Sequence, residues 1–126
     1  MPKTKWQYFK DDEVKGLDNE LVAKLDQARH IAKMPFVITS GYRTAEHNYV
    51  AGGVDDSAHT KGMAVDLLCH DSSHAGHIKR GLYAAGFKRI GNYYKLAADG
   101  SPCWSGIHVD CDSTKPQDVE WIKIRK

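Results

Sequence analysis

A histidine and an aspartate stand close together in residues 57–66, which read Ser-Ala-His-Thr-Lys-Gly-Met-Ala-Val-Asp. His59 falls in a polar loop, whereas Asp66 falls in the apolar run 63–69, which is typical of a buried strand. An ionised carboxylate that is buried without a partner costs several kcal/mol, so Asp66 needs a compensating group. A metal ion is one strong candidate. Gly62 and Ala64 are small, which would let the loop fold back and bring His59 near Asp66.

A second histidine lies far downstream, in the stretch Ile107-His108-Val109-Asp110. In a strand, His108 and Asp110 point to one face and the two apolar residues point to the other. Two histidines and one carboxylate form a usual catalytic zinc set, which leaves a fourth position for water. Zinc polarises a carbonyl under attack and lowers the pKa of that water to about 7.

Each of these residues also has an ordinary interpretation. A lone loop histidine is usually a surface residue, and a strand aspartate is often satisfied by backbone amides or an arginine. His70, His74 and His77 recur at helical intervals that could form a metal-binding face. We nevertheless expect them to be solvated, because no buried carboxylate accompanies them. The remaining two histidines, His30 and His47, are expected on helix surfaces.

An arginine follows the apolar, β-branched run 36–39 in the sequence Ser40-Gly41-Tyr42-Arg43. At a strand-to-helix turn, Arg43 can reach into a cleft and hold a carboxylate or a developing oxyanion. The alternative is a surface salt bridge, which contributes little to stability.

The composition is that of one ordinary globular domain. The chain has 126 residues, of which 41% are hydrophobic and 27% are charged, so a disordered tail, a collagen-like rod and a coiled coil are excluded. No apolar run approaches the roughly 20 residues that span a bilayer, so we expect no membrane insertion. A formal net charge of +2 provides no electrostatic footprint for nucleic acid.

The predicted elements favour an α+β fold, a single domain over 1–126 with a central antiparallel sheet flanked by helices. Residues 1–16 are polar with embedded aromatic residues and are expected to form an N-terminal arm that packs onto the domain. The hydrophobic spacing predicts helices over 17–32, 44–51 and 72–85, and strands over 36–39, 63–69, 87–90, 93–96, 107–111 and 119–124.

The N-terminal residues and the cysteines bear on localisation. No apolar stretch follows the first basic residues, so the sequence predicts no secretory signal and synthesis in the cytoplasm. The chain has three cysteines: Cys69, Cys103 and Cys111. Their odd number argues against a disulfide framework, and the lack of a Cys-x-x-Cys pair argues against a thiolate zinc site. We expect them to be reduced and partly buried.

Taken together, the motifs resemble the D-alanyl-D-alanine carboxypeptidase family of zinc peptidases, which includes related phage endolysins and shares its fold with the hedgehog signalling domain. The resemblance rests on Ser57-x-His59-x-x-Gly62-x-Ala64-x-Asp66, on the upstream Ser40-Gly41-Tyr42-Arg43 and on the downstream Ile107-His108-Val109-Asp110. It covers roughly residues 9–112 and is nearest to the small single-domain branch of the family.

The resemblance implies one Zn²⁺ held by His59, Asp66 and His108. It also implies that Arg43 binds the substrate's carbonyl or carboxylate and that Ser57 lines the site. The implied substrate is a peptidoglycan stem peptide, cut next to a D-amino acid on the bacterial cell wall. We expect a monomer.

One departure from the family pattern concerns the general base. Many members have a glutamate or aspartate three residues before the last histidine ligand, where this chain has Ser105. A serine is a poor base near neutral pH. Asp110 is predicted either to replace it or to orient a ligand histidine from outside the ligand set. Asp112 and Glu46 are weaker candidates.

Several functions remain open at this point. The chain could be a carboxypeptidase that removes the terminal D-alanine, or an endolysin-type L-Ala-D-Glu endopeptidase for phage lysis. Ser105 favours a third hypothesis, a non-catalytic zinc-binding module. A metal-dependent nuclease is suggested only by the number of histidines, and the small net charge argues against it.

Overall fold

The computed structural model describes residues 6–44 and 57–125. The predicted helix over 44–51 lies outside this range except for Thr44. No helix within the described segments is long and apolar enough to cross a membrane. The described residues form helix α1 (Asn19–Ala32), strand β1 (Ile38–Ser40), the 3-10 helix η1 (Ala58–Lys61), strand β2 (Ala64–Leu68), helix α3 (Ser72–Ala84) and strands β3 (Arg89–Leu96), β4 (Pro102–Asp110) and β5 (Val119–Arg125).

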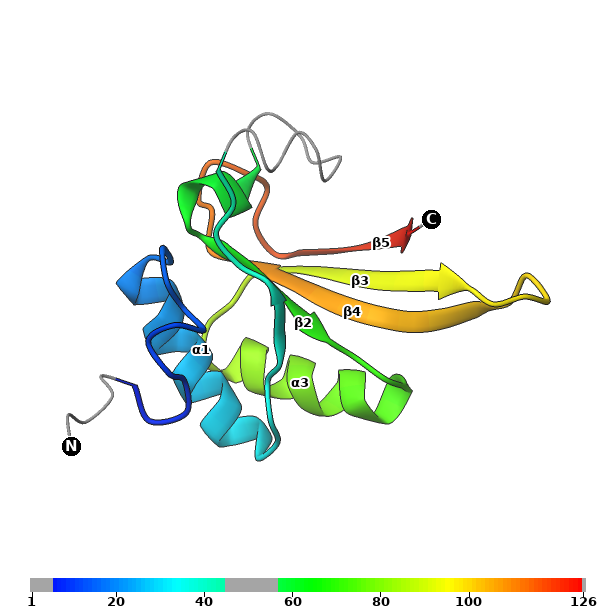
Figure 1. Ribbon diagram of the computed structural model, residues 1–126, viewed down its shortest axis with the longest axis horizontal. Coiled ribbons are helices and arrows are strands. Elements are labelled where there is room, and N and C mark those ends of the chain that lie inside the picture. The colour runs from blue at the N-terminus through cyan, green and yellow to red at the C-terminus, as the bar shows by residue number, and fades with distance from the viewer. Residues whose placement is uncertain (1–5, 45–56, 126) are drawn as a thin grey trace.

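The described strands form one sheet in the order β1-β2-β4-β3-β5, which confirms the α+β class (Figure 1). Strands β1 to β4 pair antiparallel, as predicted, but β5 pairs parallel to β3. The short connection 111–118 reverses the chain after β4. Both edges of β4 are already occupied by β2 and β3, so β5 takes the free edge of β3 and runs in the same direction as that strand.

Strand β3 is continuous where the sequence predicted two strands. Gly91 and Asn92 lie in the middle of it and pair with β4 on one side and β5 on the other. A Cβ atom at Gly91 would lie 2.8 Å from the Trp121 indole. Glycine therefore keeps β3 unbroken while Trp121 packs across it.

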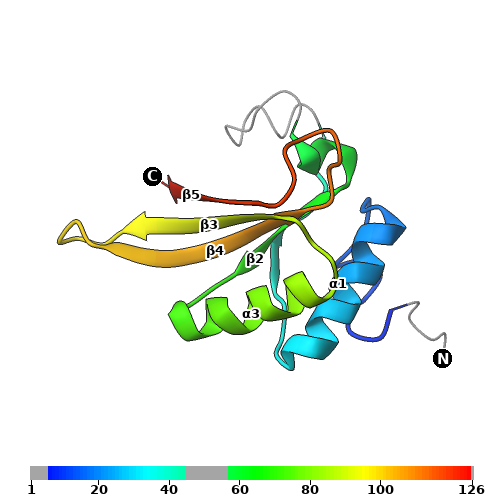
Figure 2. The same ribbon diagram turned by 180° about the vertical axis from the view of Figure 1, so that it is seen from behind.

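The two helices lie on the same side of the sheet, as both ribbon views show (Figures 1 and 2). The sequence predicted a sheet flanked by helices. In the described part of the chain, α1 and α3 both cover the same face of the sheet. Buried side chains of this face and of the two helices form one hydrophobic core. From the strands come Val65, Leu67, Ile90, Ile107 and Val109, and from the helices Leu21, Leu25, Ile78 and Leu82.

Local sequence explains where α1 begins and ends. The side chain of Asp18 accepts a hydrogen bond from the backbone N–H of Glu20, as expected for the N-cap. The helix ends at Lys33, which has a left-handed backbone (φ 57°), two residues before Pro35. Helix α3 then packs closely on α1, because a Cβ atom at Gly81 would lie 2.3 Å from the Ala28 carbonyl oxygen.

The described part of the N-terminal arm packs onto α1. Phe9 is buried in the core, and the backbone N–H of Tyr8 donates to Asp26 (2.8 Å). All three cysteines are free thiols. Cys69 is buried and Cys111 partly buried, but Cys103 is exposed, contrary to expectation, because it lies near the tip of the β3–β4 hairpin beyond the helices.

Candidate metal centre

Asp66 and His108 lie directly opposite each other on the central strands β2 and β4. Their neighbours along these strands, such as Val65 and Ile107, point into the helix-covered core. Because side chains alternate along a strand, Asp66 and His108 share the opposite face. The alternation that directs the apolar side chains into the core therefore places Asp66 and His108 side by side on the other face of the sheet.

His59 reaches this face from η1, which begins directly after Ser57. The Ser57 hydroxyl accepts a hydrogen bond from the His59 backbone N–H (3.2 Å). Gly62 ends η1 with a left-handed backbone (φ 71°), and a Cβ atom there would lie 2.5 Å from the Gly16 carbonyl oxygen. This confirms the prediction that a small residue lets the loop fold back, and it places His59 Nε2 3.4 Å from Asp66 Oδ1.

The three predicted ligands converge on one point. One ligand atom from each of His59, Asp66 and His108 lies within 4.8 Å of the others, and all three side chains are buried. His108 Nδ1 lies 3.0 Å from Asp66 Oδ1, the same oxygen that faces His59. Within the described residues, no other group of this kind is present.

The hydrogen bonds on the far side of each histidine fit a metal ligand. His59 Nδ1 lies 2.8 Å from the Gly41 carbonyl oxygen, and His108 Nε2 lies 2.7 Å from Asp110 Oδ2. Both partners only accept, so these ring nitrogens donate. With a metal ion bound, each imidazole would be neutral and would direct its lone pair from the nitrogen that faces Asp66 to the metal. The donor set therefore fits a metal ion, which two imidazoles and a carboxylate would hold with a position open to solvent.

Electrostatics links the three residues. Burial alone would lower the pKa of His108, but the carboxylates of Asp110 and Asp66 on its two ring nitrogens raise it. Burial alone would raise the pKa of Asp66, but hydrogen bonds with His108 and His59 hold it well below its usual range. Asp66 is thus ionised and ready to bind a cation at any pH near neutrality.

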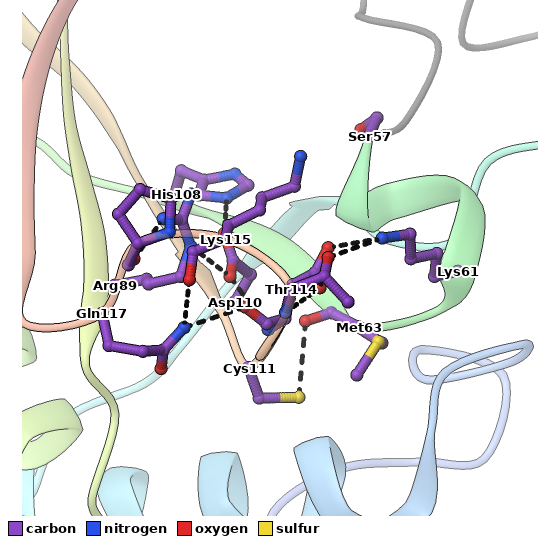
Figure 3. Close-up of polar contacts among 12 residues, drawn as sticks. Ser57, Lys61, Met63, Arg89, His108, Asp110, Cys111, Thr114, Lys115 and Gln117 are labelled. Carbon is purple, nitrogen blue, oxygen red and sulfur yellow. Dashed lines mark hydrogen bonds and ion pairs between the residues drawn. The ribbon is translucent and has the colours of Figure 1, made fainter.

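Asp110 lies beside the ligand group, and both of its oxygens are engaged (Figure 3). Oδ2 accepts from His108, and Oδ1 accepts from Arg89 Nε (2.7 Å) and the Asp112 backbone N–H (3.1 Å). Arg89 also donates to the Pro116 carbonyl oxygen (2.6 Å), which anchors the pair. Burial would raise the pKa of Asp110, but His108, the Asp112 amide and Arg89 lower it. A carboxylate held in this way is a weak base and a firm support for the histidine.

Arg43 and Ser57 both line the pocket that opens onto the ligands. The backbone N–H of Arg43 donates to the His59 carbonyl oxygen (3.1 Å), which ties the turn after β1 to η1. The Arg43 Nε atom is buried and has no hydrogen-bond partner among the described residues. An unpaired guanidinium nitrogen at this position is available to a ligand with an acceptor oxygen.

Several residues of the pocket, whose volume is about 240 Å³, were missed by the sequence analysis. The Tyr93 ring stacks on His108 with the centroids 5.9 Å apart, and burial together with Asp66 raises the pKa of Tyr93 to about 12. Its hydroxyl is therefore protonated and can donate. The alternation of Trp121, Lys123 and Arg125 along β5 was the one available signal, but it did not reveal which strand β5 joins. The pocket residues that had not been predicted are Arg89, Tyr93, Lys115, Trp121 and Lys123.

Neither Ser105, which stands where many family members have the base, nor the candidate Asp112 lines the pocket. Ser105 is an extra residue in β4, since Tyr93 and Tyr94 pair with Gly106 and Trp104, and its buried hydroxyl has no hydrogen-bond partner among the described residues. Asp112 is fully buried, and its carboxylate accepts hydrogen bonds from Lys61 and Thr114 (Figure 3). Glu46 lies outside the described residues.

The second histidine cluster does not bring three possible ligand atoms together within the part of the chain that the structure describes. The rings of His70 and His74 stack with centroids 5.2 Å apart, and His74 Nδ1 accepts a hydrogen bond from the His70 backbone N–H. His70 and His77 are exposed. These histidines are part of the solvated surface at the start of α3, as predicted.

Comparison with known proteins agrees with this geometry. The model of the family Peptidase M15 matches residues 5–97, which is most of the chain and includes Arg43, His59 and Asp66. No curated protein matches the sequence. The family match confirms the resemblance drawn from the sequence motifs, and this protein belongs to the Peptidase M15 family of metallopeptidases.

Proposed function

We propose that the protein is a zinc-dependent peptidase that hydrolyses peptidoglycan stem peptides next to a D-amino acid. The observation that carries the proposal is the convergence of His59, Asp66 and His108, since both histidines also line an open pocket. Membership in a family of metallopeptidases supports it independently. The substrate class follows the resemblance to carboxypeptidases and endolysins of the cell wall.

The residues of the chain have distinct roles in this proposal. His59, Asp66 and His108 would hold the zinc ion, which when bound polarises the scissile carbonyl and lowers the pKa of a coordinated water to about 7. The Arg43 guanidinium, with its unpaired Nε, would hold the carbonyl oxygen as negative charge develops on it. Ser57 would act indirectly, by fixing the start of η1 and hence the position of His59.

For Asp110, the geometry supports the orienting role over the role of base. By accepting the hydrogen bond from His108 Nε2, Asp110 would leave the Nδ1 lone pair, on the side of Asp66, available to the metal. Replacing a supporting carboxylate of this kind costs about 10–100-fold in metal affinity. Asp110→Asn should therefore weaken zinc binding by that factor, and saturating zinc should restore most of kcat. A loss of kcat of about 10²-fold or more at full zinc occupancy would instead identify Asp110 as the base.

The decisive test combines zinc with two substrates. The protein, loaded with one equivalent of zinc, is incubated with purified peptidoglycan and with a stem pentapeptide, and the products are identified by mass spectrometry. Loss of one alanine from the pentapeptide would establish a carboxypeptidase, and larger fragments from the wall alone would establish an endopeptidase. His59→Ala should abolish either activity, whereas the exposed His77→Ala should leave it unchanged.

A non-catalytic zinc-binding module is the second candidate. It is favoured by one specific observation. Among the described residues that line the pocket, the only carboxylate is that of Asp110, and both of its oxygens are already engaged. Zinc bound at one equivalent with no product from either substrate would support this candidate and contradict the peptidase proposal.

A further inference from the structure

Strand β5 contributes two cations to the site, although it lies beyond the segment that the family model matches. In its register with β3, Trp121 lies beside Gly91 and Lys123 beside Tyr93. The alternate residues of β5 therefore share the face of the sheet that carries the metal-ligand group. This arrangement brings Lys123 and Arg125 beside the pocket from its C-terminal edge.

Both cations lie over one aromatic ring. Lys123 Nζ is 5.7 Å from the centroid of the Tyr93 ring, and Arg125 Cζ is 4.6 Å from it. The same ring also stacks on His108, so Tyr93 lies between Lys123 and this candidate metal ligand. An aromatic ring stabilises a cation without neutralising its charge.

The charges of these two residues are poorly compensated. Lys123 is exposed and has no ion pair with any described residue, and Arg125 makes one long contact, 3.4 Å from NH2 to Asp66 Oδ2. Asp110, the carboxylate among the described residues that line the pocket, is already paired with Arg89. A metal ion bound by Asp66 would make the local charge still more positive. The pocket therefore favours a negatively charged ligand.

The position of these cations differs from that of Arg43. Arg43 follows β1, at one edge of the sheet, whereas β5 is the opposite edge, and the metal ligands on β2 and β4 lie between them. Strands are spaced about 4.8 Å apart, so β5 lies about 10 Å from β4. An extended peptide advances about 3.3 Å per residue, and a lysine side chain covers much of the remaining distance. The Lys123 ammonium is thus placed one to two residues from a peptide bond held at the metal.

We propose that Lys123 and Arg125 form an anion subsite that binds a carboxylate of the peptide substrate, one to two residues from the scissile bond and on the side opposite Arg43. The inference rests on the proposed peptidase function and narrows its substrates to anionic peptides. The carboxylate is either the C-terminal group of the peptide or an acidic side chain. Lys123 and Arg125 are specificity residues in this proposal and take no part in bond cleavage.

The test uses matched peptides and zinc-loaded protein. One pair of stem peptides differs only in a C-terminal carboxylate or carboxamide, and a second pair differs only in a glutamate or glutamine side chain. Initial rates yield kcat and KM, and NMR titration with N-acetyl-D-alanine and N-acetyl-D-alaninamide provides a readout that does not depend on hydrolysis. In at least one pair, the wild type should bind the acid about tenfold more tightly than the amide, because one hydrogen bond to a charged group contributes about that factor. Whichever pair shows the preference identifies the source of the carboxylate.

Variants assign the preference to β5. Lys123→Met removes the charge and keeps the length of the side chain. The KM values for the acid and the amide should then lie within about twofold of each other, with kcat and zinc content unchanged. Lys123→Arg should retain the preference. Arg80→Met, an exposed cation on α3, controls for the loss of net charge.

The outcomes separate the two proposals. Hydrolysis without a preference for the acid, or a preference that Lys123→Met leaves intact, would overturn the subsite and leave the peptidase function standing. A preference in the NMR titration that depends on Lys123, with no hydrolysis of any peptide, would support the subsite and overturn the peptidase function.

Discussion

The two faces of the sheet are built from the same strands but follow different physical rules. On the helix-covered face, Val65, Leu67 and Ile107 are fully buried against α1 and α3. On the other face, Asp66 and His108 are almost as deeply buried but contact charged and polar partners. The first face gains stability from removing apolar surface from water, at about 25 cal/mol per Å². On the second face, burial removes charged groups from water, and ion pairs and hydrogen bonds offset the free energy that this desolvation costs.

This difference shows how the fold accommodates a site. Each carboxylate on the open face has a cationic or hydrogen-bonding partner, as in the pair Asp110–Arg89. Such pairs contribute little net stability, but removing one member leaves a buried charge without compensation. We therefore expect changes on the helix face to alter stability alone, and changes on the open face to alter ligand binding and, where a buried charge loses its partner, stability as well.

The largest effect should come from Asp66→Asn. Loss of a supporting group already costs about 10–100-fold in metal affinity, so loss of the carboxylate ligand should cost more than 100-fold and abolish hydrolysis. Zinc affinity is measured by competition with a chelating dye, and folding of the metal-free protein by circular dichroism. The control is His77→Ala, which removes an exposed imidazole. Unchanged zinc affinity in Asp66→Asn would show that the metal site is elsewhere.

The opposite behaviour is expected on the helix face for Gly81→Ala. The added methyl group would meet the Ala28 carbonyl oxygen at 2.3 Å, so α1 and α3 must separate. Overpacking of this kind costs about 1–3 kcal/mol in the free energy of unfolding, measured by urea denaturation.

Gly76→Ala in the same helix is the matched control, because no atom lies within 4 Å of the added group. It should stabilise the protein by up to about 1 kcal/mol through helix propensity. Zinc affinity should be unchanged in both variants. If folded Gly81→Ala protein bound zinc more weakly, the two faces would not be independent.

An acid-dependent loss of stability should be traceable to Asp112. Burial would raise its pKa, but hydrogen bonds from Lys61 and Thr114 hold the pKa at about 2, below the ordinary value of 3.8. The carboxylate therefore stabilises the fold above about pH 4, by about 2 kcal/mol, and this contribution is lost as the pH falls through 2. Urea denaturation of metal-free protein should show Asp112→Asn less stable at pH 6, with the difference from wild type shrinking toward pH 2. A constant difference would refute the assignment.

The smallest effect is expected for Ser105→Ala. The buried Ser105 hydroxyl has no partner among the described residues, so its removal should change the free energy of unfolding by no more than about 1 kcal/mol, in the stabilising direction. Hydrolysis should be unaffected, because Ser105 does not line the pocket. A large loss of kcat would contradict this expectation and show that Ser105 takes part in hydrolysis.

Much of the candidate site could be predicted because its signals are local. A polar residue in an apolar strand, as at Asp66, is visible without any tertiary information. The same holds for His108 and Asp110, whose shared face follows from the period of a strand. Helix α1 was equally predictable from its spacing and from Asp18 as its cap.

The residues that were missed depend on contacts between distant segments. Arg89 precedes Asp110 by 21 positions, and only the antiparallel pairing of β3 and β4 brings them together. That pairing also places Arg89 on Asp110, which is the contact that favours our proposal of an orienting role over that of a base. Lys123 and Arg125 depend on the parallel addition of β5, which no local pattern predicts.

The sequence by itself determined the α+β class, the family and the three candidate ligands, because hydrophobic periodicity and short motifs record which residues must be buried and which chemistry they carry. Only the tertiary structure decided which cations surround those ligands and which hydrogen bonds orient them. The physical reason is that strand order and register are set by the competition of whole strands for free sheet edges, and a residue's partners across the sheet follow from that competition.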